Sequence, residues 1–252
     1  MNTQLILGLI PARFGSTRFP GKPLANIGGK PMIQRVYEQT KQQLSHVYVA
    51  TDDARIEEAV KKFGGRVVMT STHHQSGTDR CAEALDTIEK QENIKFHAVI
   101  NIQGDEPFIN PAQIEAVTHC FSNPETQLAT LVKAIDKTED LFNPNKPKVV
   151  IGSGQQALYF SRSPIPYFRG TPEEHWIEKH KYYNHIGLYG YRSDVLRAIT
   201  KLEQSPLELA ESLEQLRWLE NGYHIQVKET LSESISIDTP EDLENLIRSG
   251  LI

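Results

Sequence analysis

Apolar residues along the chain follow two alternating patterns. Short apolar runs rich in β-branched residues predict strands at residues 5–10, 46–50, 66–69, 98–102 and 128–135. Between them, apolar residues three and four positions apart predict helices at about 31–43, 53–63, 78–91 and 111–121. Strands that alternate with helices are typical of a parallel sheet covered by helices. The first half of the chain therefore predicts an α/β fold.

The pattern changes after about residue 140. Further strands are predicted at 157–161, 185–191 and 225–229, and loops rich in proline or asparagine lie at 143–147 and 164–172. We interpret this part as a mixed α+β insertion that completes or extends the sheet, and not as an independent domain.

Residues 205–222, SPLELAESLEQLRWLENG, predict one continuous helix. Ser205 is the expected N-cap and Gly222 the expected left-handed stop. At 100° per residue, one face gathers Leu209, Leu213 and Leu216, which we expect in the core. The opposite face gathers Glu211, Glu214, Gln215 and Trp218. That face is either solvated surface or, because a tryptophan lies among acids and an amide, a sugar-binding surface.

Composition narrows the class of protein. The formal net charge of -5 argues against a nucleic-acid partner, because an acidic excess repels a phosphate backbone. The N-terminal segment lacks a basic region and is too short to span a bilayer, so we expect neither secretion nor a membrane partner. The two cysteines, Cys81 and Cys120, form no disulfide framework, which suits a reducing cytoplasm.

The segment IPARFGSTRFPGKPL, residues 10–24, is a long basic loop directly after the first predicted strand. Open α/β sheets bind ligands at the carboxyl ends of their strands. The segment is not a P-loop, because five residues separate Gly15 from Gly21 and Lys22 precedes Pro23, and it lacks the dinucleotide G-x-G-x-x-G pattern. We expect it to bind a polyphosphate through backbone N–H groups, Arg13 and Lys22; the alternative is a solvated basic loop.

Two carboxylates follow predicted strands. Asp105 lies in NIQGDEP at the end of the strand at 98–102, and Asp238 lies in SIDTP after a short strand predicted from Ile235 and Ile237. Magnesium is commonly held by one or two carboxylates together with substrate phosphates. Each aspartate alone could be a turn or cap residue, but together with the cationic loop they predict a magnesium site.

Other polar motifs are less specific. THHQSGTDR, residues 72–80, precedes a predicted helix whose N-terminus could take an anion or a nucleotide. A zinc site at the adjacent His73 and His74 is a weak hypothesis. His185 and Tyr189 fall on one side of a predicted strand, either as packing or as a pocket wall. No nucleophile signature of a covalent hydrolase is found.

An ordered set of motifs covers nearly the whole chain. These motifs are IPARFGSTRFPGKPL, HQSGTDR, NIQGDEP, FNPNKPKVV, YFSRSPIPY, HIGLYGYR, SPLELAESLEQLRWLENG and IDTPEDL. With this ordered set the chain resembles the 3-deoxy-manno-octulosonate cytidylyltransferases, or CMP-Kdo synthetases. Phe19 replaces the usual leucine and Asp79 the commoner glutamate, and neither change removes a functional group.

The resemblance implies a three-layer α/β nucleotidyltransferase domain of Rossmann-like type with a mostly parallel central sheet. It would span residues 1–252, with a nucleotide-binding half at 1–135, a sugar-binding and dimerisation part at 136–235 and a C-terminal helix at 236–252. The implied reaction joins CTP and Kdo, with magnesium, to give CMP-Kdo and pyrophosphate for lipopolysaccharide synthesis. A cytoplasmic homodimer is also implied.

The resemblance also implies roles for individual residues. Arg13 and Lys22 would bind the triphosphate, and Asp105 and Asp238 would hold the metal. The other residues of the nucleotide pocket would be Pro11, Ala12, Ser16, Thr78, Arg80 and Gln103. The sugar would contact Arg162, His185, Tyr189, Glu214 and Gln215.

Two alternatives stay open. The same phosphate-binding residues could serve a cytidylyltransferase for another acidic sugar, such as 8-amino-Kdo or a sialic acid. A nucleotide-sensing module without catalysis is the second, although a mere binder needs no pair of metal-binding carboxylates. A glycosyltransferase would be expected to show an Asp-x-Asp motif, whereas Asp105 is followed directly by Glu106.

Overall fold

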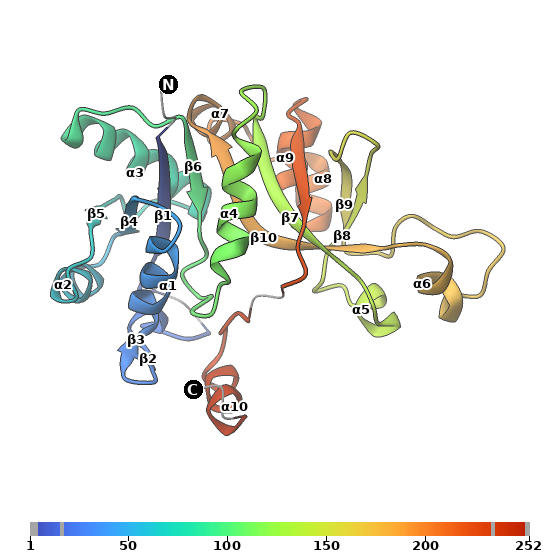
Figure 1. The fold of residues 1–252 in the computed structure, drawn as a ribbon, viewed down its shortest axis with the longest axis horizontal. Coiled ribbons are helices and arrows are strands. Elements are labelled where there is room, and N and C mark those ends of the chain that lie inside the picture. The colour runs from blue at the N-terminus through green and yellow to red at the C-terminus, as the bar shows by residue number, and fades with distance from the viewer. Residues whose placement is uncertain (1–4, 16–17, 233–234, 250–252) are drawn as a thin grey trace.

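The computed structural model describes residues 5–15, 18–232 and 235–249 and contains a central sheet (Figure 1). Seven of its strands run in the order β11-β7-β10-β6-β1-β4-β5. Their bounds are β1 Ile6–Ala12, β4 His46–Thr51, β5 Val67–Met69, β6 Ala98–Asn101, β7 Leu128–Ala134, β10 Tyr183–Arg192 and β11 Ile225–Glu229. Two further strands, β8 (Lys148–Ile151) and β9 (Ala157–Ser161), pair with each other, and β8 also pairs with β10.

Among the described strands, four of the six neighbouring pairs in this seven-strand order are parallel. Strand β1 pairs in parallel with β4 and β6, β4 with β5, and β7 with β11. Strand β10 lies between β6 and β7 and is antiparallel to both. The second half of the chain therefore extends the same sheet, and the α/β prediction is confirmed.

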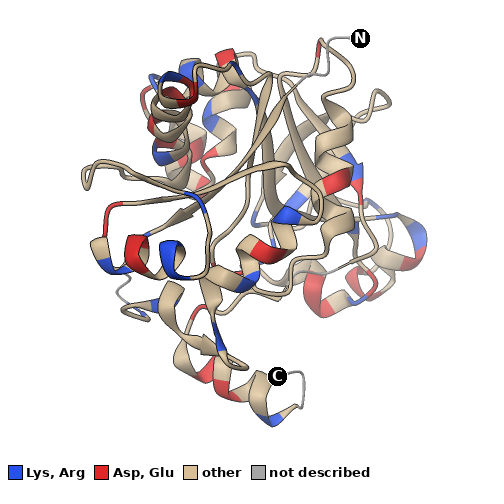
Figure 2. Cartoon of the chain, turned by 60° about the vertical axis from the view of Figure 1, so that its left-hand side comes forward, with Lys and Arg blue, Asp and Glu red and all other residues tan. Residues whose placement is uncertain are grey.

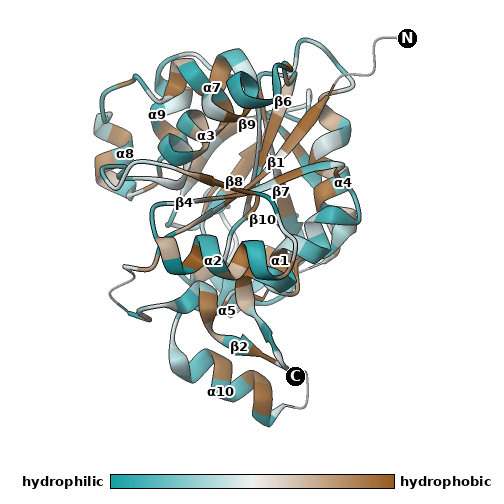
Figure 3. Ribbon diagram, turned by 90° about the vertical axis from the view of Figure 1, so that its left-hand side faces the viewer, coloured by the Kyte–Doolittle hydropathy of each residue, from teal (hydrophilic) through white to brown (hydrophobic). Residues whose placement is uncertain are grey.

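Helices cover both faces of the sheet. One face packs on α1 (Met32–Lys41), α2 (Ala54–Lys62) and α4 (Pro111–Cys120). The other packs on α3 (Gly77–Glu92), α7 (Ser193–Ile199) and α9 (Gln215–Glu220). Each face has its own apolar core, and the helices carry both apolar and polar residues (Figure 3). The predicted three layers are confirmed.

The helix starts show why the sequence places them there. Asn110 caps α4 and forms a capping box with Gln113. Thr239 caps α10 (Pro240–Arg248) in the same way. The helix predicted from about residue 31 begins at Met32, and Pro31 lies at its N-cap position.

The prediction of one helix over 205–222 is wrong. The segment forms α8 (Pro206–Glu211) and α9, separated at Ser212, which has a left-handed φ of 51°. The break changes which residues face the core: Leu209 is 62% exposed, whereas Trp218 is 1% exposed. The predicted cap at Ser205 and the left-handed Gly222 are confirmed.

Some short elements lie outside the predicted pattern. Strand β8 was not predicted, nor were the hairpin strands β2 (Asn26–Ile27) and β3 (Lys30–Pro31). The remaining short helices are α5 Thr138–Phe142, α6 Trp176–Lys179, η1 Lys22–Leu24 and η2 Glu173–His175.

The strand predicted from Ile235 and Ile237 is also wrong. Residues 235–238 form no strand; instead the Ile237 N–H donates to the Asp105 carbonyl at 3.0 Å. The Ile237 side chain is buried with Ile27, Met32 and Leu246, which ties α10 to the β2–β3 hairpin.

Three further features concern the described residues. In the described ranges, no helix is long and apolar enough to cross a membrane. Cys81 and Cys120 are both buried free thiols. Basic and acidic residues are interspersed over the same helices (Figure 2).

Candidate active site

A cavity of about 260 Å³ opens at the carboxyl ends of β1 and β6. Its walls include Pro11, Ala12, Arg13, Arg18, Lys22, Pro23, His74, Gln75, Ser76, Gly77, Arg80, Gln103, Gly104, Asp105 and Asp238. The structure thus brings together Arg13, Lys22, Asp105 and Asp238, which the sequence predicts as catalytic or metal-binding, and most of the residues predicted for the nucleotide. Ser16 lies outside the described residues.

In the basic loop after β1, the backbone of Gly21 contacts the backbone of Phe14 just before Lys22. The N–H of Gly21 donates to the carbonyl of Phe14 at 3.0 Å, and Gly21 has a left-handed φ of 72°. A Cβ at this glycine would lie 3.1 Å from the Phe14 ring, so a side chain there would be both strained and crowded. The guanidinium carbon of Arg55 lies over the Phe14 ring, 3.3 Å from the ring centroid.

Lys22 connects the two carboxylates predicted to hold a metal. Its Nζ lies 2.7 Å from Asp105 Oδ2 and 3.2 Å from Asp238 Oδ1. The Ile237 N–H bond to Asp105 O explains this closeness, because it fixes the residue before Asp238 against Asp105. Two carboxylate oxygens that converge on one cationic nitrogen are a donor set that suits a hard cation. The described residues contain no group of three or more such ligands.

Glycines let the backbone segments of the cavity wall approach closely. A Cβ at Gly104 would lie 2.9 Å from the Pro11 carbonyl, and one at Gly77 would lie 3.4 Å from the Pro11 ring. Ser76 caps α3, with a reciprocal bond from Asp79, so this N-terminus is fixed where it meets the cavity. Residues 74–77 of the THHQSG segment, which precede most of α3, therefore form part of the cavity wall.

The predicted sugar-binding residues are not among the residues of the cavity wall, and one of them, Glu214, contacts Thr78. Thr78 Oγ1 donates to Glu214 Oε2 at 2.8 Å, and burial raises the pKa of Glu214. Thr78, predicted for the nucleotide pocket, therefore contacts a predicted sugar residue. Within the described ranges, three buried polar atoms of the chain have no hydrogen-bond partner here: Asn101 Oδ1, Tyr189 Oη and Gln215 Nε2.

His185 and Tyr189 lie on the same side of β10, as predicted, and their ring centroids are 5.2 Å apart. A register shift lies between Ile186 and Tyr189 in β10. The Nε2 of His185 is 3.1 Å from the Thr130 hydroxyl, and burial lowers the pKa of His185 to about 4. The imidazole is therefore neutral at pH 7.

Arg162 is held by backbone carbonyls. Its guanidinium donates to Glu211 O at 2.6 Å, to Pro144 O at 2.9 Å and to Ser212 O at 3.3 Å. It thereby ties the loop before β8 to the break between α8 and α9. Its position is fixed, although it does not line the cavity.

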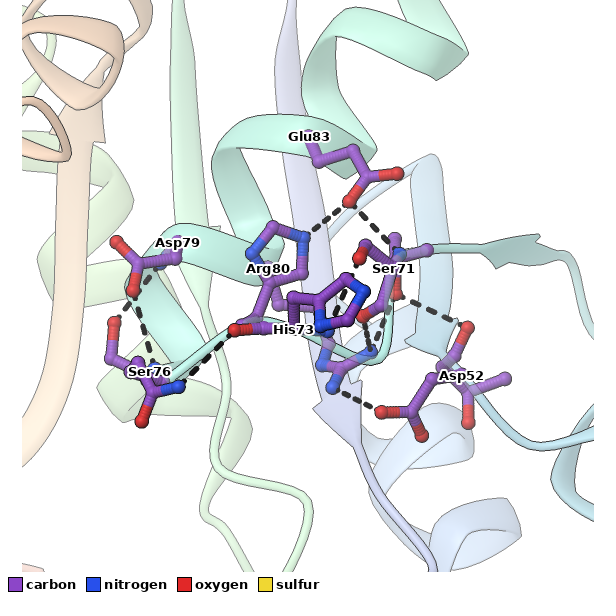
Figure 4. A network of polar contacts seen from close by, with 11 residues as sticks. Asp52, Ser71, His73, Ser76, Asp79, Arg80 and Glu83 are labelled. Carbon is purple, nitrogen blue, oxygen red and sulfur yellow. Dashed lines mark hydrogen bonds and ion pairs between the residues drawn. The ribbon is translucent and has the colours of Figure 1, made fainter.

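Several residues in or next to the cavity wall were not predicted from the sequence. Arg18 lines the cavity and lies 3.3 Å from Asp238, and its basic loop was the signal that could have found it. Asp52, which binds Arg80 at 2.6 Å, directly follows a strand, as Asp105 does. Figure 4 shows the contacts of Arg80 with Asp52 and Ser71.

Residues 7–235 match the family model described as cytidylyltransferase. The chain belongs to the cytidylyltransferase family. The 3-deoxy-manno-octulosonate cytidylyltransferase of Parabacteroides distasonis is 60% identical to this cytidylyltransferase over 245 residues, with 96% of each chain covered. The protein of the same name from Geobacter sulfurreducens is 50% identical over 250 residues, with 96% of this chain and 98% of that protein covered. These relatives confirm the resemblance drawn from the motifs.

A solved structure of CMP:2-keto-3-deoxy-manno-octonic acid synthetase in complex with CTP is similar to this cytidylyltransferase. It has a TM-score of 0.88 and 42% identity, and the match covers 98% of this chain and all of that one. A glucose-1-phosphate thymidylyltransferase structure from Bacillus anthracis has a TM-score of 0.63 at 17% identity, over 95% of this chain and 93% of that one, and shows a shared fold.

Proposed function

We propose that the chain transfers CMP from CTP to the anomeric hydroxyl of 3-deoxy-manno-octulosonate (Kdo). The products are CMP-Kdo, an activated sugar for lipopolysaccharide synthesis, and pyrophosphate. The observation that carries the proposal is the convergence of Lys22, Asp105 and Asp238 beside the basic loop. The relatives named for this reaction, matched over nearly their whole length, support it.

In this proposal the chain acts mainly by positioning and by charge neutralisation, which dominate phosphoryl-type transfer. Arg13 and Lys22 bind the triphosphate, and the exposed Arg18 guanidinium adds a third positive charge. Pro11, Ala12, Arg80 and Gln103 complete the nucleotide pocket. Gln103 donates to the Gly187 carbonyl at 3.0 Å, which links this wall to β10 on the sugar side.

Magnesium is the proposed cofactor, and Asp105 and Asp238 are the residues that would hold it. Both side chains are partly exposed, and both already bind one cation, the ammonium of Lys22. The metal, when bound, would neutralise phosphate charge and lower the pKa of the attacking hydroxyl. The ammonium of Lys22 then becomes available for a phosphate oxygen.

The sugar is assigned to Arg162, His185, Tyr189, Glu214 and Gln215. The unpartnered Tyr189 hydroxyl and Gln215 amide support a polar guest, because buried polar groups are normally hydrogen-bonded. Residues 1–135 would then serve the nucleotide and 136–235 the sugar. The C-terminal part, 236–252, would supply Asp238.

We further propose a cytoplasmic homodimer. Large apolar side chains are exposed on the sugar-binding part, including Leu158, Tyr167 and Leu209, which are 60%, 74% and 62% exposed. Two free buried thiols suit a reducing compartment. Sedimentation velocity would test the dimer, with Leu158→Glu and Leu209→Glu expected to shift it to monomer.

Pyrophosphate release tests the reaction. CTP, ATP, GTP and UTP would each be combined with Kdo, 8-amino-Kdo or a sialic acid, in magnesium and in EDTA. Release that requires CTP, Kdo and magnesium is the expected result. Release with another acidic sugar would contradict the sugar assignment only, and silence in every combination while CTP still binds would indicate a nucleotide-sensing module.

A further inference from the structure

Arg80 is a buried arginine in the wall of the cavity. It lies on the first turn of α3, and only 4% of the residue is exposed. The other wall arginines, Arg13 and Arg18, are exposed. Buried charges need a partner, because an isolated ion loses its hydration. The partner of Arg80 therefore decides what this guanidinium can do.

That partner is Asp52, the residue that follows β4. Nη2 of Arg80 lies 2.6 Å from Asp52 Oδ2, and the two side chains are 5% and 16% exposed. Pairs of this kind are short and directional. The positive charge of Arg80 is thus compensated within the protein before any ligand enters.

A second anchor fixes the plane of the guanidinium. Nη1 of Arg80 donates to Thr70 Oγ1 at 2.6 Å, and the Thr70 hydroxyl donates to the Thr51 carbonyl at 3.2 Å. Thr51 ends β4 and Thr70 follows β5. Arg80 is therefore held against the ends of two neighbouring strands.

The same network fixes the loop that leads to α3 (Figure 4). Arg80 Nη1 donates to the Ser71 carbonyl at 3.4 Å, and the Ser71 N–H donates to Glu83 at 3.0 Å. Glu83 also binds the ring of His74, a further wall residue. Both backbone groups of Ser71 are thus bound by α3, so the wall and Arg80 are one rigid unit.

We propose that Asp52 is a positioning residue that holds Arg80 as a hydrogen-bond donor for the nucleoside part of CTP. Arg80 has five N–H groups, and its contacts with Asp52, Thr70 and Ser71 leave others for a ligand. Because Asp52 compensates its charge, Arg80 is suited to an uncharged acceptor on base or ribose. The exposed Arg13 is suited to phosphates. This inference rests on the proposed nucleotide site.

Binding of CTP and CMP to Asp52→Asn, measured by calorimetry, tests the proposal. A lost bond to a charged group weakens binding by about 10- to 100-fold. We expect Asp52→Asn to weaken CMP and CTP by the same factor. Arg13→Ala should weaken CTP far more than CMP, because it removes a phosphate contact. The matched control is Asp86→Asn, which breaks the Asp86–Arg197 pair at 2.6 Å outside the cavity wall and should leave both affinities unchanged.

Two results would overturn the inference: unchanged affinities in Asp52→Asn, or a loss confined to CTP. If Asp52→Asn does not fold, Thr70→Val decides instead, since it removes the second anchor and keeps the ion pair. It should give a smaller loss that is again equal for CMP and CTP, and an unchanged or CTP-only effect refutes the proposal. Failure of the unaltered protein to bind CTP would refute the proposed nucleotide site itself, and this inference with it.

Discussion

The Nζ atom of Lys22 lies 2.7 Å from Oδ2 of Asp105, although the two residues are 83 positions apart. The same ammonium also binds Asp238. A lysine therefore lies where the proposed metal would bind, and the ammonium would compete with the metal for the same oxygens. Two predictions follow from this arrangement, one for the carboxylates and one for the lysine.

Asp105→Asn and Asp238→Asn should each lower kcat by about 100-fold or more, because the metal contributes several kcal/mol of charge stabilisation. EDTA should abolish the turnover of the unaltered protein. Pyrophosphate release measures both effects. Asp86→Asn is the control with the same chemical change; a comparable loss in that variant would count against a specific role for the two carboxylates.

Lys22→Met should strengthen magnesium binding in the absence of nucleotide and weaken CTP binding by about 10-fold or more, since it removes both a competitor and a phosphate contact. Calorimetry with each ligand separates the two effects. Lys30→Met is the control, because Lys30 pairs with Glu38 on an exposed surface. Weaker magnesium binding in Lys22→Met would contradict the competition.

Tyr189→Phe should raise KM for Kdo by about 5- to 10-fold and leave the free energy of unfolding unchanged or up to about 1 kcal/mol higher. In the described structure its buried hydroxyl has no hydrogen-bond partner, so its removal breaks no bond within the protein. Tyr191→Phe is the comparison, because its hydroxyl accepts from Asn101 Nδ2 at 3.5 Å. Steady-state kinetics and urea denaturation give the two quantities. A clear loss of stability in Tyr189→Phe, with KM for Kdo unchanged, would argue against a sugar contact.

His185 predicts how stability depends on pH. Burial lowers its folded-state pKa to about 4, below the ordinary unfolded value of about 6.5. Between these values the unfolded chain binds the proton and the folded chain does not, so the free energy of unfolding falls as pH drops from 6.5 to 4. His185→Gln should remove this contribution, at most about 3 kcal/mol. Urea denaturation at pH 7, 6, 5 and 4 checks it; parallel curves for both proteins would show that His185 does not titrate in this way.

Ser212 is held in the left-handed conformation at φ 51° between α8 and α9. Ser212→Val should lower the free energy of unfolding by about 1–2 kcal/mol, because β-branched residues are strained there. Ser212→Gly is the matched variant, with a change of less than about 0.5 kcal/mol, since it relieves strain but loosens the unfolded chain. Equal stability of the two variants in thermal or urea unfolding would exclude a strained backbone at this position.

The sequence could predict the parts of the site that lie at the ends of regular strands. The loop after β1 was recognisable because it is long and basic, and Asp105 because it ends an apolar run. Asp52 also follows a strand, but the adjacent Asp53 caps α2. The pair of aspartates is therefore explained in the sequence as the start of a helix. Its role depends on Arg80, 28 residues away, which no local pattern connects to it.

The helix break at Ser212 shows a second limit. Serine carries no signal for a left-handed residue, and the leucine spacing continues through it. Tertiary contacts stabilise the break. Glu208 and Arg217 form a buried bidentate ion pair, and Arg162 donates to the carbonyls of Glu211 and Ser212. These contacts outweigh the local helical preference. Trp218 is consequently turned into the core, where it packs on Tyr189 and Tyr191.

Because Ile237 follows every strand of the central sheet along the chain, the ribosome completes these strands before the hydrogen bond from Ile237 to Asp105 can form. Asp238 is made 216 positions after Lys22, when every strand of the central sheet has already been synthesised. A nascent chain can therefore form its whole sheet before its second carboxylate exists. A protease cut between β11 and α10 would have the same effect, because it would release Asp238 while leaving the sheet intact. In the proposed mechanism, catalytic competence is thus acquired late in synthesis, and a chain that has formed its sheet but lacks Asp238 would not release pyrophosphate.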